Sequence, residues 1–167
     1  MTAVTYSQAH REFTEIANTA PPGYIYERQG SSETCLYVHG GYAGPLEAAS
    51  GRPPEPLRCG CIVAHWLHRY HRVPLPALAA MESLSAPNIV IRLLAQGALL
   101  PDFLEDDTGC QVLKFVQVIQ ACQDSRLPWR DAVVRAHDLV TSRPWSYLLG
   151  PEWPSDGPVP MAVSVDA

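Results

Sequence analysis

The chain has 167 residues, of which 47% are hydrophobic and 17% are charged, and its formal net charge is −5. This length and composition indicate one folded domain with its own core, and they exclude an intrinsically disordered chain. The negative charge argues against a dedicated nucleic-acid binder, because such proteins bind phosphates through dense lysine and arginine. We therefore expect no nucleic-acid partner.

Targeting and membrane signals are absent from the sequence. The first residues lack the basic segment and the continuous apolar stretch of a signal peptide. No apolar run approaches the roughly 20 residues that a membrane-spanning helix needs. We expect a cytoplasmic protein without a membrane partner, in which the five cysteines are reduced.

The first predicted element is a helix near the N-terminus. Thr5 and Gln8 have the Thr-x-x-Gln spacing of a capping box, in which two residues satisfy backbone N–H groups at a helix start. Apolar residues follow at helical spacing, namely Phe13, Ile16 and Ala17. The Pro-Pro-Gly run at 21–23 then ends the helix.

A β-hairpin and a long loop are predicted next. YIYE at 24–27 and CLYVHGG at 35–41 are rich in aromatic and β-branched residues and flank a polar turn, which is typical of two paired strands. Residues 40–58 combine several glycines and prolines with little apolar periodicity, so they predict a long loop. Loops of this length in compact domains are often functional or mobile.

Helices are predicted for most of the chain after the loop. Beyond the helix at 60–72, four segments carry helical periodicity or helix-start signals, at 75–82, 86–97, 108–124 and 128–140. Ser85 and Gly97 are the expected N-cap and C-terminal stop of the second of these. Thr108 and Gln111 form a second capping box. The sequence therefore predicts an α+β fold, mostly helical, with about five or six helices and one short β-hairpin near the N-terminus.

The last two predicted helices supply much of the expected core. Their apolar residues repeat at helical spacing, at Val112, Phe115, Val116, Ile119, Ala132, Val133, Ala136 and Val140. Pro128 lies near the first turn of the final helix, where proline is favoured, and Trp129 follows it. We interpret Trp129 as a core residue that fixes the start of this helix, with an exposed anchor for a partner as the alternative.

The composition changes after Arg143, which predicts a tail. Residues 144–167 contain five prolines and two tryptophans, and this proline density is incompatible with regular structure. We therefore expect a single globular domain at 1–143, containing the long loop at 40–58, and a Pro/aromatic-rich tail at 144–167. The tail offers large side chains for partner binding, at Trp145, Tyr147, Leu148, Leu149 and Trp153. They either fold back onto the helices or bind another chain, including a second copy, because a soluble monomer seldom exposes so much apolar area.

The segment RCGCIVAHWLHRYHRVP at 58–74 has the densest chemistry in the chain, with two cysteines and three histidines. On a helix that turns about 100° per residue, one side is apolar and is expected to face the core, at Ile62, Val63, Trp66, Leu67 and Tyr70. The opposite side carries Cys61, His65, His68 and Arg72. We expect His65 and His68 to point away from the core, either solvated or covered by another segment.

Three interpretations of this Cys/His helix stay open. A structural helix is preferred, because cysteine usually acts as a compact apolar side chain. A zinc site is the second, since thiolate and imidazole are favoured zinc ligands, although the spacing matches no standard zinc motif. Its ligands would be Cys35, Cys59, Cys61 and His65. A cysteine-dependent hydrolase or transferase is the third, with Cys59 or Cys61 at the helix N-terminus, where the dipole lowers a thiol pKa, and His39 as base.

Four stretches of the chain together form a recognisable sequence pattern. They are CLYVHGG, CIVAHWLHRYHRVPLPAL, NIVIRLL and VQVIQACQDSRLPWRDAV. This pattern resembles a group of small uncharacterised proteins of actinobacteria and their phages, which read Cys-x-Tyr, then a Cys-Leu-Val-Gly helix, then Gln-Asp-x-x-x-x-Trp. The matching positions are Cys35, Tyr37, Gly40 or Gly41, Cys61, Leu67, His68, Val73, Pro74, Leu75, Gln123, Asp124, Trp129, Ala132 and Val133. The chain departs from the pattern at Ala64 and His71, which replace glycines, and in its longer loop. The resemblance favours a structural role in which Cys35 packs against Cys61 at the start of the helix, rather than the zinc ligand set. It implies a fold and an actinobacterial or phage origin, but no reaction.

The preferred function is that of a non-catalytic cytosolic protein that acts by protein interaction or as a regulator. Its protein partner, or a second copy of the chain, would bind through the long loop and the aromatic tail, and a phage-encoded protein would act on a host protein. No cofactor is expected in this interpretation, and zinc belongs only to the alternative of a zinc-stabilised regulatory module. The second alternative is the cysteine-dependent hydrolase or transferase.

Overall fold

Helices make up most of the protein in the computed structural model, which describes residues 4–26, 36–41, 53, 55–82, 84–95 and 107–142. The described elements, in chain order, are α1 (Tyr6–Thr19), β1 (Val38–Gly41), β2 (Glu55–Cys59), α3 (Ile62–His71), α4 (Leu75–Ala79), α5 (Ala86–Ala95), α6 (Asp107–Asp124) and α7 (Trp129–Thr141). The predicted fold class, α+β and mostly helical with a short hairpin near the N-terminus, is confirmed. No helix within the described ranges is long and apolar enough to cross a membrane.

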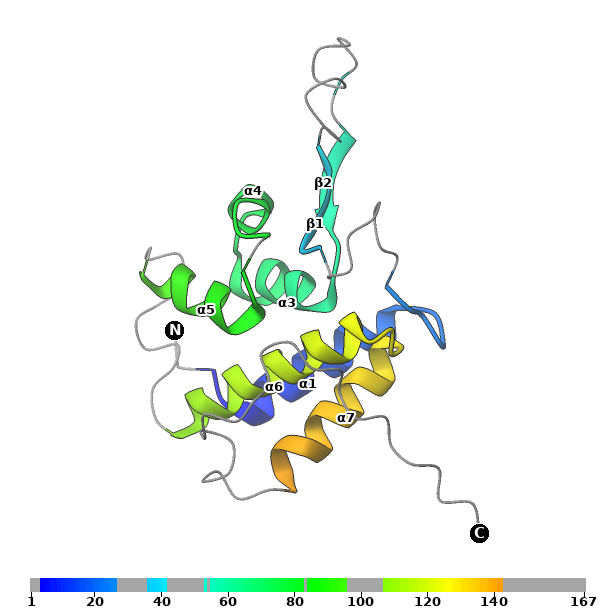
Figure 1. Ribbon diagram of the computed structural model, residues 1–167, viewed down its shortest axis with the longest axis vertical. Coiled ribbons are helices and arrows are strands. Elements are labelled where there is room, and N and C mark those ends of the chain that lie inside the picture. The colour runs from blue at the N-terminus through cyan, green and yellow to red at the C-terminus, as the bar shows by residue number, and fades with distance from the viewer. Residues whose placement is uncertain are drawn as a thin grey trace.

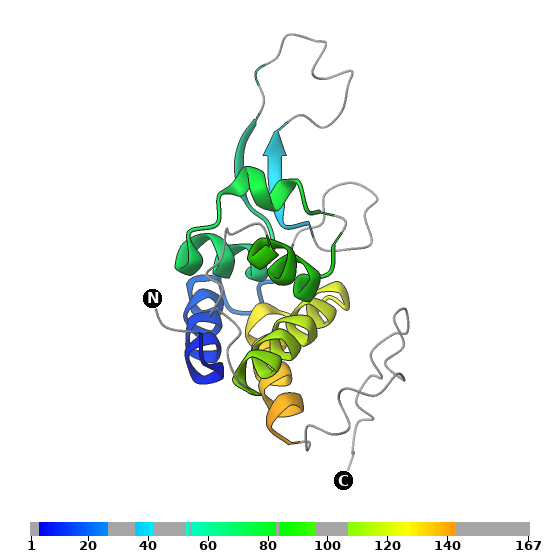
Figure 2. The same cartoon turned by 90° about the vertical axis from the view of Figure 1, so that its left-hand side faces the viewer.

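The helices form one body, and the hairpin stands out from it (Figure 1). α1, α6 and α7 pack alongside one another, while α3 contacts α1 and α6, and α5 contacts α6. The hairpin of β1 and β2 projects away from these helices, with α4 beside it. Figure 2 shows the same projection from the side, with the far ends of both strands clear of the helical body.

An aromatic centre joins three of the helices. The ring centroids of Phe13 on α1 and Trp66 on α3 lie 5.0 Å apart, and Phe115 on α6 packs edge-on to Phe13 at 5.5 Å. All three side chains are fully buried, and aromatic residues bury more apolar area than any other type. The apolar residues predicted for the core of the last two helices are also buried, so the helical periodicity identified them correctly.

The helix starts follow the sequence signals at α1 and α7 but not at α6. The side chain of Thr5 accepts a hydrogen bond from the Gln8 N–H at 3.2 Å, so Thr5 caps α1 as predicted. Pro128 is the N-cap of α7. α6 begins earlier than predicted, at Asp107, so Thr108 lies inside the helix and is not its N-cap.

The strands pair differently from the prediction. β1 pairs with β2 in antiparallel register, with Val38 opposite Cys59. Residues 24–26, which were expected to form the first strand, form none, and β2 lies inside the predicted loop at 40–58. β2 reads Glu-Pro-Leu-Arg-Cys, and its proline and two charged residues carry no strand periodicity. Its pairing therefore depends on contacts with residues distant in the sequence.

Arg72 ends α3 in the left-handed backbone conformation, with φ of 59°. Its backbone N–H donates to the Leu67 carbonyl, and the Val73 N–H donates to the same carbonyl at 3.1 Å. This backbone conformation costs a residue with a Cβ about 1–2 kcal/mol, whereas glycine adopts it freely. Glycine is accordingly the usual residue at this place after a helix.

The substitution Arg72→Gly is expected to raise the free energy of unfolding by about 1 kcal/mol. The Arg72 side chain is exposed, so its removal forfeits little packing. Arg72→Ala is the matched control, because alanine keeps the Cβ and is expected to leave stability nearly unchanged. Urea unfolding of the three proteins measures the difference, and a glycine variant no more stable than the alanine variant would contradict the expectation.

Candidate functional site

The two cysteines of the Cys/His segment lie where β2 ends and α3 begins. Cys59 is the last residue of β2 and is half-buried, whereas Cys61 is the N-cap of α3 and is fully buried. The helical wheel placed Cys61 on the side of the histidines, which is wrong, whereas its burial agrees with the preferred interpretation, in which cysteine acts as a compact apolar side chain. The backbone of Cys61 is extended, with φ of −90° and ψ of 166°, so its side chain does not follow the helical wheel.

The Cys59 and Cys122 thiols are not activated as nucleophiles. Burial, together with the neighbouring Cys61, raises the pKa of the Cys59 thiol to about 11. Burial likewise raises the pKa of the Cys122 thiol to about 11. Both thiols are therefore protonated at neutral pH, whereas the thiolate is the nucleophilic form. Cys59 thus lacks the activation that the cysteine-enzyme alternative requires.

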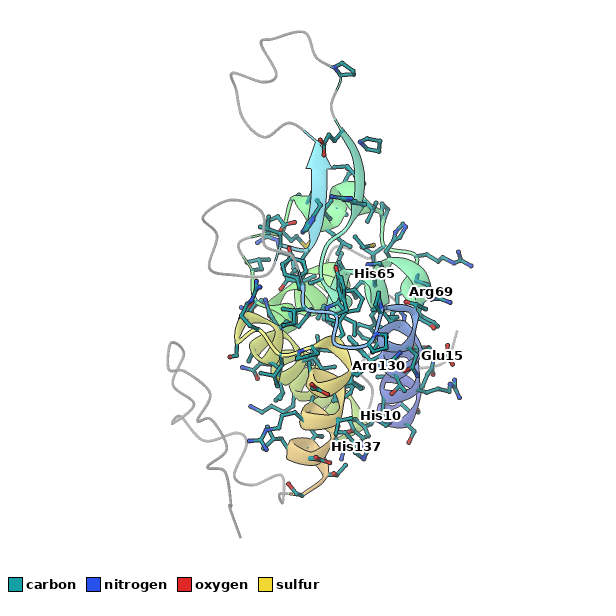
Figure 3. The ribbon with its side chains drawn as sticks, turned by 90° about the vertical axis from the view of Figure 1, so that its right-hand side faces the viewer. His10, Glu15, His65, Arg69, Arg130 and His137 are labelled. Carbon is teal, nitrogen blue, oxygen red and sulfur yellow. The ribbon has the colours of Figure 1, made fainter. Side chains whose placement is uncertain are left out.

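His65 packs against the start of α7, on the face shown in Figure 3. Its ring lies edge-on to Trp129 with centroids 5.4 Å apart, and Trp129 lies edge-on to Tyr24 at 4.8 Å. The Trp129 side chain is buried and its backbone N–H donates to the Tyr24 carbonyl at 3.0 Å, so Trp129 does fix the start of α7. Burial, and then the positive charges of His68 and Arg69, lower the pKa of His65, which keeps its ring neutral at pH 7.

His68 is exposed and supports the end of α3. Its Nδ1 lies 2.8 Å from the Val73 carbonyl oxygen. A carbonyl oxygen only accepts hydrogen bonds, so Nδ1 of His68 carries the proton in this bond. The bond ties the last turn of α3 to the residues after Arg72, which is a structural role of the kind that the preferred interpretation expects.

The described members of the zinc ligand set do not converge. Within the part of the chain that the structure describes, no three His, Cys, Asp or Glu side chains are grouped so that they could hold a metal ion. Cys59, Cys61 and His65 belong to that part, whereas Cys35 lies outside it. The zinc interpretation therefore has no support from three of its four ligands. The structural pairing of Cys35 with Cys61 stays a prediction.

α1 holds a buried carboxylate that the sequence pattern did not single out. Glu12 Oε2 accepts a hydrogen bond from Trp66 Nε1 at 2.8 Å, and Oε1 accepts one from Gln8 Nε2 at 2.9 Å. His71 Nε2 lies 3.6 Å from Oε2. Burial raises the pKa of Glu12, but the nearby His71 ring and the hydrogen bonds from Gln8 and Trp66 outweigh burial and lower it. The carboxylate is therefore charged at neutral pH and ties α1 to α3.

The base of the hairpin is fixed on one side by a buried tyrosine–histidine pair. The Tyr26 hydroxyl lies 2.5 Å from Nε2 of His39. The same hydroxyl accepts a hydrogen bond from the Leu36 N–H at 2.9 Å and donates to the Leu36 carbonyl at 3.0 Å. Since a hydroxyl has one proton, His39 Nε2 is the donor whenever that proton points to Leu36. His39, the proposed base for a catalytic cysteine, is thus engaged with Tyr26.

Glu82 and Gln120 hold the hairpin base from the side of the helices. The two carboxylate oxygens of Glu82 accept hydrogen bonds from the Tyr37 and Val38 N–H groups, at 2.8 and 2.7 Å. Burial raises the pKa of Glu82, and these two backbone bonds oppose the rise. Gln120 on α6 donates to the Tyr37 hydroxyl at 2.7 Å and accepts from the Ala86 N–H at 2.5 Å. The start of the hairpin is therefore bonded to Glu82 and to Gln120 of α6, and Gln120 in turn binds the first residue of α5.

Comparisons of the chain with protein-family models, with curated proteins and with solved structures found no match. The resemblance to actinobacterial and phage proteins therefore stays a prediction. The predicted partner-binding residues lie outside the described part of the chain, namely Trp145, Tyr147, Leu148, Leu149 and Trp153. Most of the segment between β1 and β2 lies outside it as well. The described residues therefore hold the base of the projecting hairpin to the helices, through the bonds of His39, Tyr37 and Val38.

Proposed function

We propose that this protein is a non-catalytic cytosolic interaction or regulatory protein, which binds its partner through the end of the hairpin and the C-terminal tail. The observation that carries the proposal is the projection of the hairpin from the helical body (Figures 1 and 2). β2 is exposed along most of its length, at Glu55, Pro56, Leu57 and Arg58. We call the hairpin of β1 and β2 the arm. Because β1 ends at Gly41 and β2 begins at Glu55, the segment between them starts and ends at the far end of the arm.

The attachment of the hairpin supports a binding role. Its base is held by the Tyr26–His39 pair on one side and by Glu82 on the other, so the arm leaves the body in a fixed position. A binding segment that is already positioned loses less conformational entropy when its partner binds. A mere connection between β1 and α3 would need neither the projection nor these bonds.

Two observations favour a non-catalytic role over the cysteine-enzyme alternative. The Cys59 thiol has its pKa raised to about 11, so it carries no charge at neutral pH. The Nε2 atom of His39, the proposed base, is hydrogen-bonded to the Tyr26 hydroxyl. The Cys/His segment therefore serves to join the hairpin to α3 and to pack that helix.

The proposed partner is a protein. For a phage-encoded chain, in keeping with the resemblance stated above, it would be a host protein; the other candidate is a second copy of this chain. Proline restricts the backbone, so a sequence with five prolines, such as residues 144–167, loses less conformational entropy than an ordinary one when a partner binds it.

The test compares the intact chain with one variant in which Asn-Gly replaces residues 42–54 and with another that lacks residues 144–167. Asn-Gly closes a two-residue hairpin turn, so β1 and β2 can stay paired. We expect the intact chain to retain a discrete protein from an actinobacterial lysate or to self-associate in light scattering. Each variant is expected to bind about tenfold more weakly, because it lacks part of the contact surface.

Ile91→Ser is the matched control, since Ile91 is an apolar residue of α5 that is 50% exposed and lies outside the arm. It is expected to bind as well as the intact chain. Circular dichroism checks that every variant keeps its helices. Undiminished binding by both the hairpin variant and the tail truncation would refute the proposal.

A further inference from the structure

Two histidines from different helices stack on each other between α1 and α7. The rings of His10 and His137 have centroids 4.2 Å apart and planes inclined by 26°. Figure 3 shows the pair at one end of the face formed by α1 and α7, with His65 near the other end. The Tyr6 hydroxyl and His137 Nδ1 are joined by a hydrogen bond of 2.9 Å. All three side chains of the stack are partly exposed, so protons from solvent can reach them.

The stacked geometry does not suit a shared metal ion. Imidazole binds zinc at about 2.0–2.1 Å along the lone pair of a ring nitrogen, which lies in the plane of the ring. In two nearly parallel rings 4.2 Å apart, the lone pairs run side by side instead of converging. An ion shared by both rings would have to lie between their faces, away from both lone pairs. The chemistry that remains for this pair is the uptake of protons near neutral pH.

The groups around the stack limit how many protons it can hold. Burial, and then the negative charge of Asp138, raise the pKa of Tyr6 to about 12, so the phenol stays neutral. From α6, the Phe115 ring lies edge-on to Tyr6 at 5.3 Å and to His10 at 5.8 Å, and it brings no charge. A second positive ring at 4.2 Å from the first would meet strong repulsion.

We propose that the His10–His137 stack is a proton-sensitive contact between α1 and α7. While both rings are neutral, their stacking and the bond to Tyr6 join the two helices. When the pH falls, protonation sets like charges against each other and weakens the docking of α7 on α1. The contact is made by residues of α1 and α7 and needs no partner, so its test is independent of partner binding.

The pKa of His10 determines whether the contact loses stability as the pH falls or as it rises. Burial, and then the electrostatic interaction with the His137 ring, lower the pKa of His10 below the ordinary histidine value of 6.5. Near that pH the unfolded chain therefore binds more protons than the folded chain. The stability contributed by the contact is complete above pH 6.5 and is lost as the pH falls from there through the lower folded-state pKa.

The intact chain is tested by nuclear magnetic resonance between pH 8 and pH 5, which follows the histidine rings and the backbone amides. We expect the amides of residues 6–10 and 134–141 to shift with the same midpoint as the His10 ring. In urea unfolding, the folding equilibrium constant of the intact chain should fall severalfold more between pH 7.5 and pH 5.5 than that of His10→Gln. His68→Gln is the matched control, because the His68 ring is exposed and bonded to the Val73 carbonyl, and this variant should behave like the intact chain.

Amides of α1 and α7 that stay fixed while His10 titrates would overturn the proposal. A His10→Gln variant whose stability depends on pH as strongly as that of the intact chain would overturn it as well. Should His10→Gln fail to fold, the titrations of the rings and amides in the intact chain still decide the matter.

Discussion

Replacing Gly60 by alanine is expected to lower the free energy of unfolding by about 3 kcal/mol. A Cβ at this position would lie 2.3 Å from the Leu36 carbonyl oxygen, and 2.7 and 2.9 Å from Cδ2 and Nε2 of His39. Leu36 is held in place, because its carbonyl accepts a hydrogen bond from the Tyr26 hydroxyl at 3.0 Å. The Gly60 N–H also donates to the Tyr37 carbonyl at 2.8 Å, which keeps the two backbones together. The clash therefore falls on the joint between the hairpin and α3.

Gly23→Ala is the matched control for this substitution. Gly23 has φ of 74° and open space around its Cα, so alanine there meets backbone strain of about 1 kcal/mol and no clash. In a His39→Ala background the ring contacts are gone but the contact with Leu36 remains, so Gly60→Ala should cost less there than in the natural sequence, though still more than Gly23→Ala. Urea unfolding followed by circular dichroism measures all five proteins. If Gly60→Ala costs no more than Gly23→Ala, the hairpin base is not packed as described.

The helices could be predicted because their signals are local. The capping hydrogen bond of Thr5 spans three residues, and the apolar residues of α6 and α7 repeat within one or two turns. The same reasoning placed Trp66 and Leu67 in the core. It was wrong for Cys61, because a helical wheel applies only after the helix has begun and Cys61 is the residue before it.

Features that join distant parts of the chain could not be predicted in this way. The aromatic stretch around Tyr26 indicated a strand, but its hydroxyl instead bonds to His39, 13 residues later. A glutamate within a helix, such as Glu12, is expected to be exposed to solvent. Its hydrogen-bond donor Trp66, which allows the carboxylate to be buried, lies 54 residues away in the sequence. The position of Glu12 beside the core residue Phe13 was the available signal. A charge next to the apolar side of a helix needs a partner, and the sequence alone does not name one.

Replacing Glu12 by glutamine is expected to lower the free energy of unfolding by about 2 kcal/mol. The carboxylate accepts hydrogen bonds from Trp66 Nε1 and from Gln8 Nε2, one on each oxygen. Glutamine has nearly the same shape, but its single oxygen can face only one of these donors, and its N–H groups would face the other. A buried donor is then left without an acceptor, which is the costly outcome. In a Trp66→Phe background one donor is already gone, so Glu12→Gln should cost less there than in the natural sequence.

Acid should narrow the difference between the natural protein and Glu12→Gln. Burial raises the pKa of Glu12, but the nearby His71 ring and the hydrogen bonds from Gln8 and Trp66 outweigh burial and hold this pKa below the ordinary value of 4.5. The carboxylate therefore contributes stability that is present above pH 4.5 and is lost as the pH falls through the lower folded-state pKa. Glu15→Gln is the control on the same helix: Glu15 is exposed, accepts from the Tyr70 hydroxyl at 2.6 Å, and should change stability by less than about 0.5 kcal/mol. Equal effects of the two substitutions in urea unfolding at pH 7, or a Glu12→Gln difference that persists in acid, would mean that something other than this carboxylate ties α1 to α3.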